Sequence, residues 1–102
     1  MKVIYIEDFK SQPQIKEING SLEELQKLVN GYIQILYYHD IAIVCNEEGK
    51  LRDFAPTRPL YDRNGEIYEI ICGSMVIVSQ TENESLTEEQ IEKWTKMFSL
   101  GV

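Results

Sequence analysis

The sequence predicts an α+β fold, with one domain over residues 1–102. We expect a mainly antiparallel central sheet of four or five strands, two amphipathic helices and an irregular proline-containing segment. Three observations predict this fold: β-branched or aromatic runs recur along the chain, two segments have helical periodicity between caps, and Gly, Pro or Asn turns separate them. A length of 102 residues with 43% hydrophobic content fits one domain.

Apolar runs rich in Val, Ile and Tyr predict the strands of the sheet. Two runs are apolar at both parities, so both of their faces should be covered. His39 and Asp40 separate two runs and predict the tight turn of a β-hairpin. Residues 51–54 are a candidate short strand, and residues 66–71 are either a short strand or a helical turn. Residues 15–18 either pair with the first strand or extend irregularly after Pro13. The other expected strands are residues 3–6, 32–38, 41–45 and 74–78.

Two segments with capping residues predict the helices. The first begins after Ser21, where Glu24 would complete a capping box, and it ends at the Asn-Gly pair of residues 30–31. The second begins after Thr87, with Gln90 in the position of Glu24. Its side chains expected on the sheet are Ile91, Trp94 and Phe98.

The segment between the two central apolar runs contains several turn signals and a local cluster of basic residues. Its two prolines, Pro56 and Pro59, exclude a central strand between them. The candidate binding residues of the chain are the four basic side chains of this segment. They are Lys50, Arg52, Arg58 and Arg63.

Arg58 is the charged residue that the sequence singles out, because two prolines restrict the loop around it. In one interpretation its guanidinium group is ready to bind a carboxylate or a phosphate. In the other, which we favour, it stabilises the loop by pairing with Asp53, Asp62 or a nearby carbonyl group.

Composition limits the partners. The chain has 17 acidic and 10 basic residues, a net charge of −7, which argues against direct binding to nucleic acid. A basic or neutral partner, most simply a protein, fits better. No apolar run is long enough to span a membrane, and acidic residues follow the first short run, so we expect a cytoplasmic protein without a membrane segment.

The sequence predicts no catalytic residue, no metal site and no cofactor. Glycine-rich phosphate loops are missing from it, and His39 is its single histidine. A dyad of His39 with Cys45 or Cys72 is formally available, but five strand residues would separate the first pair by roughly 15 Å. Both cysteines lie in apolar runs and are expected to be reduced and largely buried. The tyrosines at 32, 37 and 38 are expected mainly in the core, with an aromatic contact surface as the alternative.

Three blocks within residues 46–73 carry a resemblance to a known family. They are the N-E-E-G-K-L turn of residues 46–51, the P-x-R-x-L block of residues 56–60 and the D-x-x-G-E-I-Y-x-I-I-x-G block of residues 62–73. With the two helix starts, these blocks resemble the domain-of-unknown-function family 3846 over nearly the whole chain. Thr57 and Pro59 stand where the family pattern has Asn and Ala.

The resemblance implies a small protein of bacterial conjugative elements, plasmids or phages, and it brings no activity and no catalytic residue. The function expected from it is a non-enzymatic accessory or binding protein of a mobile genetic element. Two alternatives remain open: an acidic inhibitor that occupies a host DNA-processing enzyme by charge mimicry, and a small enzyme with an anion pocket at Arg58.

Overall fold

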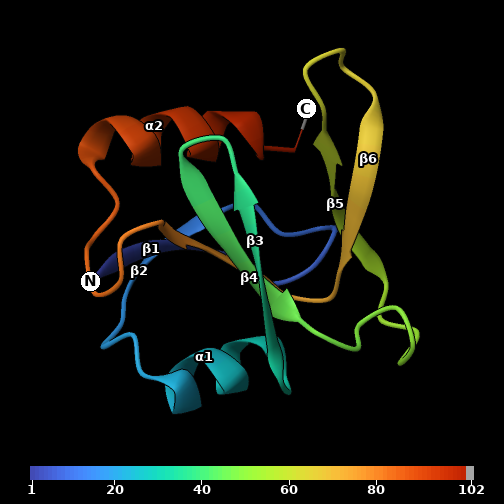
Figure 1. Cartoon of the computed structure of the whole chain (residues 1–102), viewed down its shortest axis with the longest axis horizontal. Helices are drawn as coiled ribbons and strands as arrows, with labels where there is room; N and C mark the ends of the chain where they lie inside the picture. The colour runs from blue at the N-terminus through green and yellow to red at the C-terminus, as the bar shows by residue number, and fades with distance from the viewer. Residues whose placement is uncertain (101–102) are drawn as a thin grey trace.

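The computed structural model describes residues 1–100, which form two sheets and two helices (Figure 1). The larger sheet has five antiparallel strands in the order β2-β1-β7-β4-β3, and β5 and β6 form a separate two-stranded antiparallel sheet. The elements are β1 (Lys2–Ile6), β2 (Gln14–Glu17), α1 (Leu22–Val29), β3 (Ile33–Tyr38), β4 (Ile41–Asn46), β5 (Pro56–Tyr61), β6 (Ile67–Cys72), β7 (Met75–Ser79) and α2 (Glu88–Met97).

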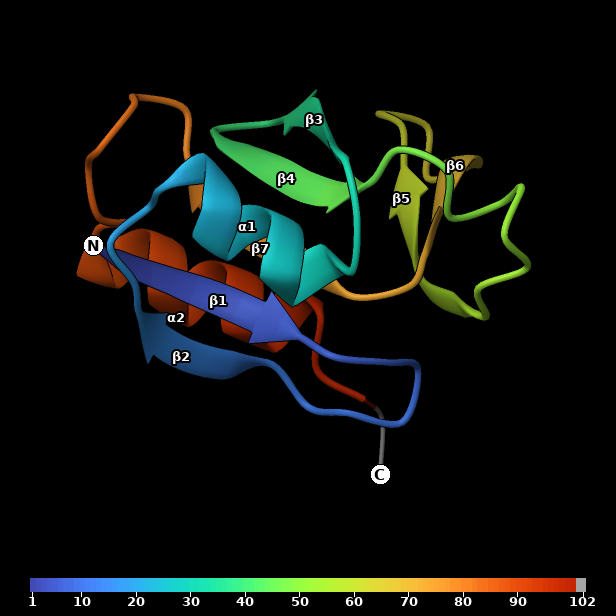
Figure 2. The ribbon, with the colours of Figure 1, turned by 90° about the horizontal axis from the view of Figure 1, so that it is seen from below.

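The two helices lie on opposite faces of the five-stranded sheet (Figures 1 and 2). The face toward α2 carries the larger apolar cluster, in which Trp94 and Phe98 pack with side chains of the sheet and of the β5–β6 pair. The face toward α1 carries a smaller cluster that includes Val29 of the helix. The helix that begins after Thr87 therefore packs on the face with the larger cluster.

β4 is buried along its whole length, because it lies between two strands and each of its faces packs into an apolar cluster. Ile43 and Cys45 belong to the cluster on the α2 side, whereas Ala42 and Val44 belong to the cluster on the α1 side. The expectation of a strand covered on both faces is confirmed, as is the hairpin that joins it to β3.

The helix caps follow the sequence with one difference. The Thr87 hydroxyl accepts from the backbone N–H of Gln90, whose side chain accepts from the N–H of Thr87, so the capping box of α2 is complete. Ser21 likewise accepts from the N–H of Glu24. The Glu24 carboxylate accepts instead from the backbone amides of residues 19 and 20, which precede the Ser21 amide that a capping box would use.

The proline-containing segment is not irregular, which corrects the sequence-based expectation. Pro56 and Pro59 lie in β5, which pairs only with β6, with register shifts at either end. Proline is compatible with such a strand because one side of it makes no ladder bonds. Residues 51–54 form turns and no strand, and residues 66–71 fall largely in β6, so the strand alternative is the correct one there.

Candidate functional site

Arg58 lies inside the molecule, with 6% of its surface exposed. Its Nε donates to the carbonyl oxygen of Phe98 at 2.9 Å, just beyond the end of α2. Nη1 donates to the carbonyl of Thr57 at 2.8 Å, and Nη2 donates to that of Ser11 at 2.6 Å. A longer contact of 3.5 Å joins Nη1 to the carbonyl of Asp8. One side chain therefore holds together β5, the β1–β2 loop and the C-terminal end of α2.

The partners of Arg58 are carbonyl oxygens and not the carboxylates considered from the sequence. The carboxylate of Asp62 instead accepts from the amides of Asn64 and Glu66 in its own turn. Burial lowers the pKa of Arg58 from its ordinary value, and the negative charge of Asp8 opposes that shift. The carbonyl of Phe98 carries the negative end of the helix dipole, which favours a cation there.

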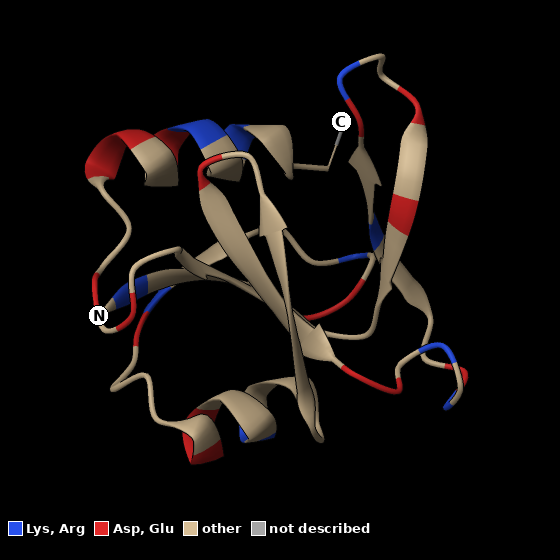
Figure 3. Cartoon of the chain, in the orientation of Figure 1, with Lys and Arg blue, Asp and Glu red and all other residues tan. Residues whose placement is uncertain are grey.

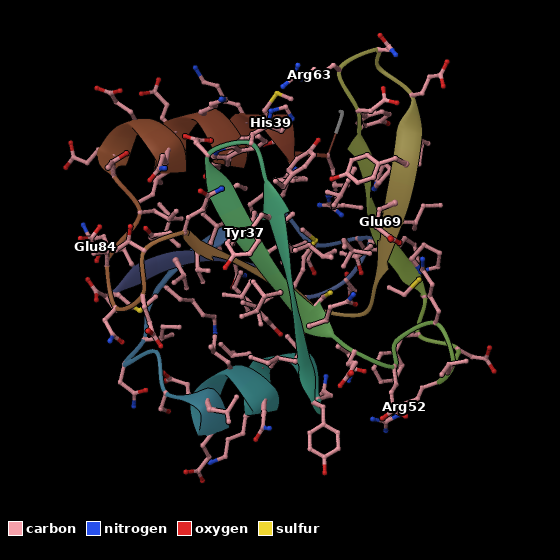
Figure 4. The ribbon with its side chains drawn as sticks, in the orientation of Figure 1. Tyr37, His39, Arg52, Arg63, Glu69 and Glu84 are labelled. Atoms are coloured by element: carbon pink, nitrogen blue, oxygen red, sulfur yellow. The ribbon has the colours of Figure 1, made fainter. Side chains whose placement is uncertain are left out.

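The other three basic residues do not join Arg58 in one site. Lys50 forms an ion pair with Glu69 of β6, and this hydrogen bond lowers the pKa of the Glu69 carboxyl. Arg52 donates to the carbonyl of Asn30 at 3.1 Å. Arg63 lies at the tip of the β5–β6 hairpin, far from Arg52 at its opposite end (Figure 4). The basic cluster of the sequence is thus dispersed in the structure.

Both cysteines border one small pocket of about 170 Å³, together with Lys50 and Glu69. Neither forms a disulfide; Cys45 is buried as expected, whereas Cys72 is only half-buried. Burial raises the pKa of the Cys45 thiol to about 11. Because the thiolate is the nucleophile, this shift makes Cys45 unreactive near neutral pH.

His39 occupies the β3–β4 turn, where its backbone has a positive φ of 53°. Its ring packs against Tyr38 and Trp94, with centroid separations of 4.4 and 5.6 Å. The indole N–H of Trp94 donates to the carboxylate of Asp40 at 3.0 Å. The turn therefore joins the hairpin to α2. Cys45 lies toward the other end of β4, too far from His39 to form a Cys–His dyad with it.

An apolar groove of about 500 Å³ opens on the α1 side of the sheet. Leu22 and Leu25 of α1 form one wall and the segment after β7 closes one end. The remaining wall and floor come from β3, β4 and the end of β7. We refer to this site as the α1 groove, and its β3 residues are Ile33, Ile35 and Tyr37.

The groove exists because α1 is short. Its eight residues span only about 12 Å, so it covers part of the sheet and leaves the β3 side open. As a result Leu22, Ile35 and Tyr37 are exposed by 57%, 49% and 70%. The expectation that the tyrosines lie mainly in the core is correct for Tyr38 and wrong for Tyr32 and Tyr37.

The described residues hold no group of three or more His, Cys, Asp or Glu side chains placed to bind a metal ion. Among these residues no helix is both long and apolar enough to cross a membrane.

A model of one protein family, described as Domain of unknown function (DUF3846), matches residues 1–99. The chain belongs to this family. The resemblance inferred from the three sequence blocks is therefore confirmed, and the family's description assigns it no activity. No curated protein and no solved structure matches the chain.

Proposed function

We propose that the chain is a non-enzymatic accessory protein of a mobile genetic element, that it works in the cytoplasm, and that it binds another protein through the α1 groove. The observation that carries this proposal is the exposure of Leu22, Ile35 and Tyr37 around one apolar groove. Exposed apolar side chains gathered in a concave site are typical of binding surfaces.

The charge of the groove indicates what kind of segment would bind there. Among the described residues that line the groove, Glu82 is the one with a charged side chain. The whole chain has a net charge of −7. Complementary charge accelerates association and disfavours wrong partners. A protein segment with apolar side chains and flanking Lys or Arg residues therefore suits the groove better than an acidic one.

The basic residues considered from the sequence support binding at their positions less well. Arg58 is buried against carbonyl groups, Lys50 is paired with Glu69, and Arg52 is held by a carbonyl oxygen. An anion pocket at Arg58 would require free donors, whereas its guanidinium group is already bonded on both sides. We therefore place the binding function at the groove and not at Lys50, Arg52, Arg58 and Arg63.

Charge mimicry of DNA also receives less support than groove binding. Acidic residues begin both helices and recur in the loops and in the β5–β6 pair, with Lys and Arg between them (Figure 3). Mimicry of a duplex requires negative charges arranged along one face, because the enzyme being inhibited reads a regular row of phosphates.

The test is a selection of displayed peptides on the immobilised protein, followed by affinity measurements on variants. Leu22→Ser and Tyr37→Ser should each weaken the selected peptides about tenfold or more, as expected for anchors in an apolar site. Ile67→Ser is the matched control, because Ile67 is 54% exposed on β6, outside the groove. Selected peptides that bind both groove variants as tightly as the wild type would contradict the proposal.

A further inference from the structure

The two edges of the five-stranded sheet differ in how they are protected. β2 has four residues, follows Pro13 and carries Lys16 and Glu17. β3 has six residues, no charge and no proline, and its register against β4 is unbroken. Natural sheets shield their edges with charges, prolines, bulges or short strands, because an open edge pairs with other chains. β3 lacks these devices, so its edge is free for strand addition.

The register of the hairpin shows which main-chain groups of β3 are free. The N–H of Glu47 donates to the carbonyl of Tyr32 at 2.8 Å, so this pair is a hydrogen-bonded one. Bonded and non-bonded pairs alternate along an antiparallel ladder. Even-numbered residues of β3 therefore bond to β4, and odd-numbered residues direct N–H and C=O groups to the open edge. These outward-facing residues are Ile33, Ile35 and Tyr37.

The same three residues contribute side chains to the α1 groove. Their main-chain groups and their side chains thus offer two kinds of contact to a single incoming strand. In antiparallel addition, a residue that bonds to one of them places its side chain on the same face of the sheet. Alternate side chains of the added strand would then enter the groove beside Leu22, while the intervening ones would lie on the other face.

We propose that the partner is an extended protein segment that joins β3 as an antiparallel sixth strand, with apolar residues at alternate positions and Lys or Arg at its ends. This inference rests on the proposed function and specifies how the groove is occupied. Glu82 and the net charge of −7 select the basic ends. A second copy of the chain carries the same net charge of −7, and this repulsion argues against a dimer through β3.

The probe is the peptide Lys-Lys-Val-Thr-Val-Thr-Val-Lys-Lys with blocked termini, added to the isotope-labelled protein. Hydrogen exchange of individual amides is measured by NMR with and without the peptide. The amides of Ile33, Ile35 and Tyr37 should exchange about tenfold or more slowly when the peptide is bound. Neighbouring amides such as that of Leu36 bond to β4 already and should change little.

Two methylated peptides separate main-chain pairing from side-chain contact. Methylation of the valine nitrogens removes donors aimed at β3 and should weaken binding about tenfold, whereas methylation of the threonine nitrogens leaves those donors intact. A version with Glu in place of Lys should also bind at least about tenfold more weakly.

On the protein side, Ile35→Pro should abolish binding. Ile15→Pro is the matched control, because Ile15 is exposed and its N–H faces outward on the opposite edge.

The results separate a failure of strand addition from a failure of the proposed binding through the α1 groove. Strand addition is overturned if the valine-methylated peptide binds as well as the parent, or if the amides of Ile33, Ile35 and Tyr37 gain no protection. Protection of these amides by raising the protein concentration alone would make a second copy the occupant and would also overturn the proposal. The groove function fails separately, when selected peptides are insensitive to Leu22→Ser and Tyr37→Ser.

Discussion

Replacing Arg58 by alanine should destabilise the protein strongly, because this side chain connects three separate parts of the chain. The carbonyl oxygens of Phe98 and Thr57 lose charged donors at 2.9 and 2.8 Å in buried surroundings. Ser11 loses a third donor in a position that water can reach more easily.

The size of the effect follows from the two buried bonds. A hydrogen bond from a charged donor contributes about 1.5–3 kcal/mol, and an unpaired buried carbonyl adds a desolvation cost of similar size unless water replaces the donor. We expect Arg58→Ala to lower the free energy of unfolding by about 3–5 kcal/mol. Arg58→Lys should lose about half as much, because an ammonium group cannot reproduce the planar fork of donors.

Urea unfolding, followed by circular dichroism, measures both variants. Arg52→Ala is the control, since Arg52 is an exposed residue with a single carbonyl bond, and it should change the free energy by less than about 1 kcal/mol. An Arg58→Ala variant as stable as the wild type that no longer binds a selected peptide would refute the structural role and return Arg58 to the functional site.

Three further predictions concern the core and the titratable groups. Trp94 is buried against Phe98, so Trp94→Ala should cost about 3–5 kcal/mol in urea unfolding, whereas exposed Met97→Ala on the same helix should cost little; a tryptophan emission spectrum like that of the free amino acid would contradict this packing. The pKa of Cys45 is raised from 9.0 to about 11, so its contribution to stability should be complete below pH 9.0 and lost as the pH rises from there toward 11. Urea midpoints of the wild type and of Cys45→Ala measure that loss, and parallel curves for the two proteins would disprove it. Burial opposes the ionisation of Asp40, but hydrogen bonds from two side chains of α2 outweigh it and lower its pKa below 3.8. The stabilisation that Asp40 provides over Asp40→Asn should therefore be present above that pH and should disappear as the pH falls through the lowered pKa; a constant difference in acid unfolding would show that the shift is absent.

Local signals predicted most of the fold. Ser21 and Thr87 mark the starts of the two helices because an N-cap depends only on residues within one turn. The turn at His39 sets the β3–β4 hairpin in the same local way. The register and the faces of these elements then follow from their periodicity.

The parts that sequence reasoning missed depend on contacts between distant segments. The main partners of Arg58 include Ser11 and Phe98, which lie 47 and 40 residues away along the chain. No local sequence pattern indicates these contacts. The prolines of β5 indicated an irregular loop because their tolerance in a strand depends on which edge is left unpaired.

The α1 groove was missed for a similar reason. Tyr37 has the sequence environment of a core residue, and only the short length of α1 leaves it exposed. Alternation within β3 could have placed Ile33, Ile35 and Tyr37 on one face. It could not have shown that this face lacks a cover.

Hydrogen–deuterium exchange of the protein with a library-selected peptide, read over the whole chain, tests the central claim most directly. The account predicts that protection increases in β3 and around Leu22 and residues 80–83, which surround the α1 groove. Protection that falls instead on the loop holding Lys50 and Arg52, with β3 unchanged, would contradict it.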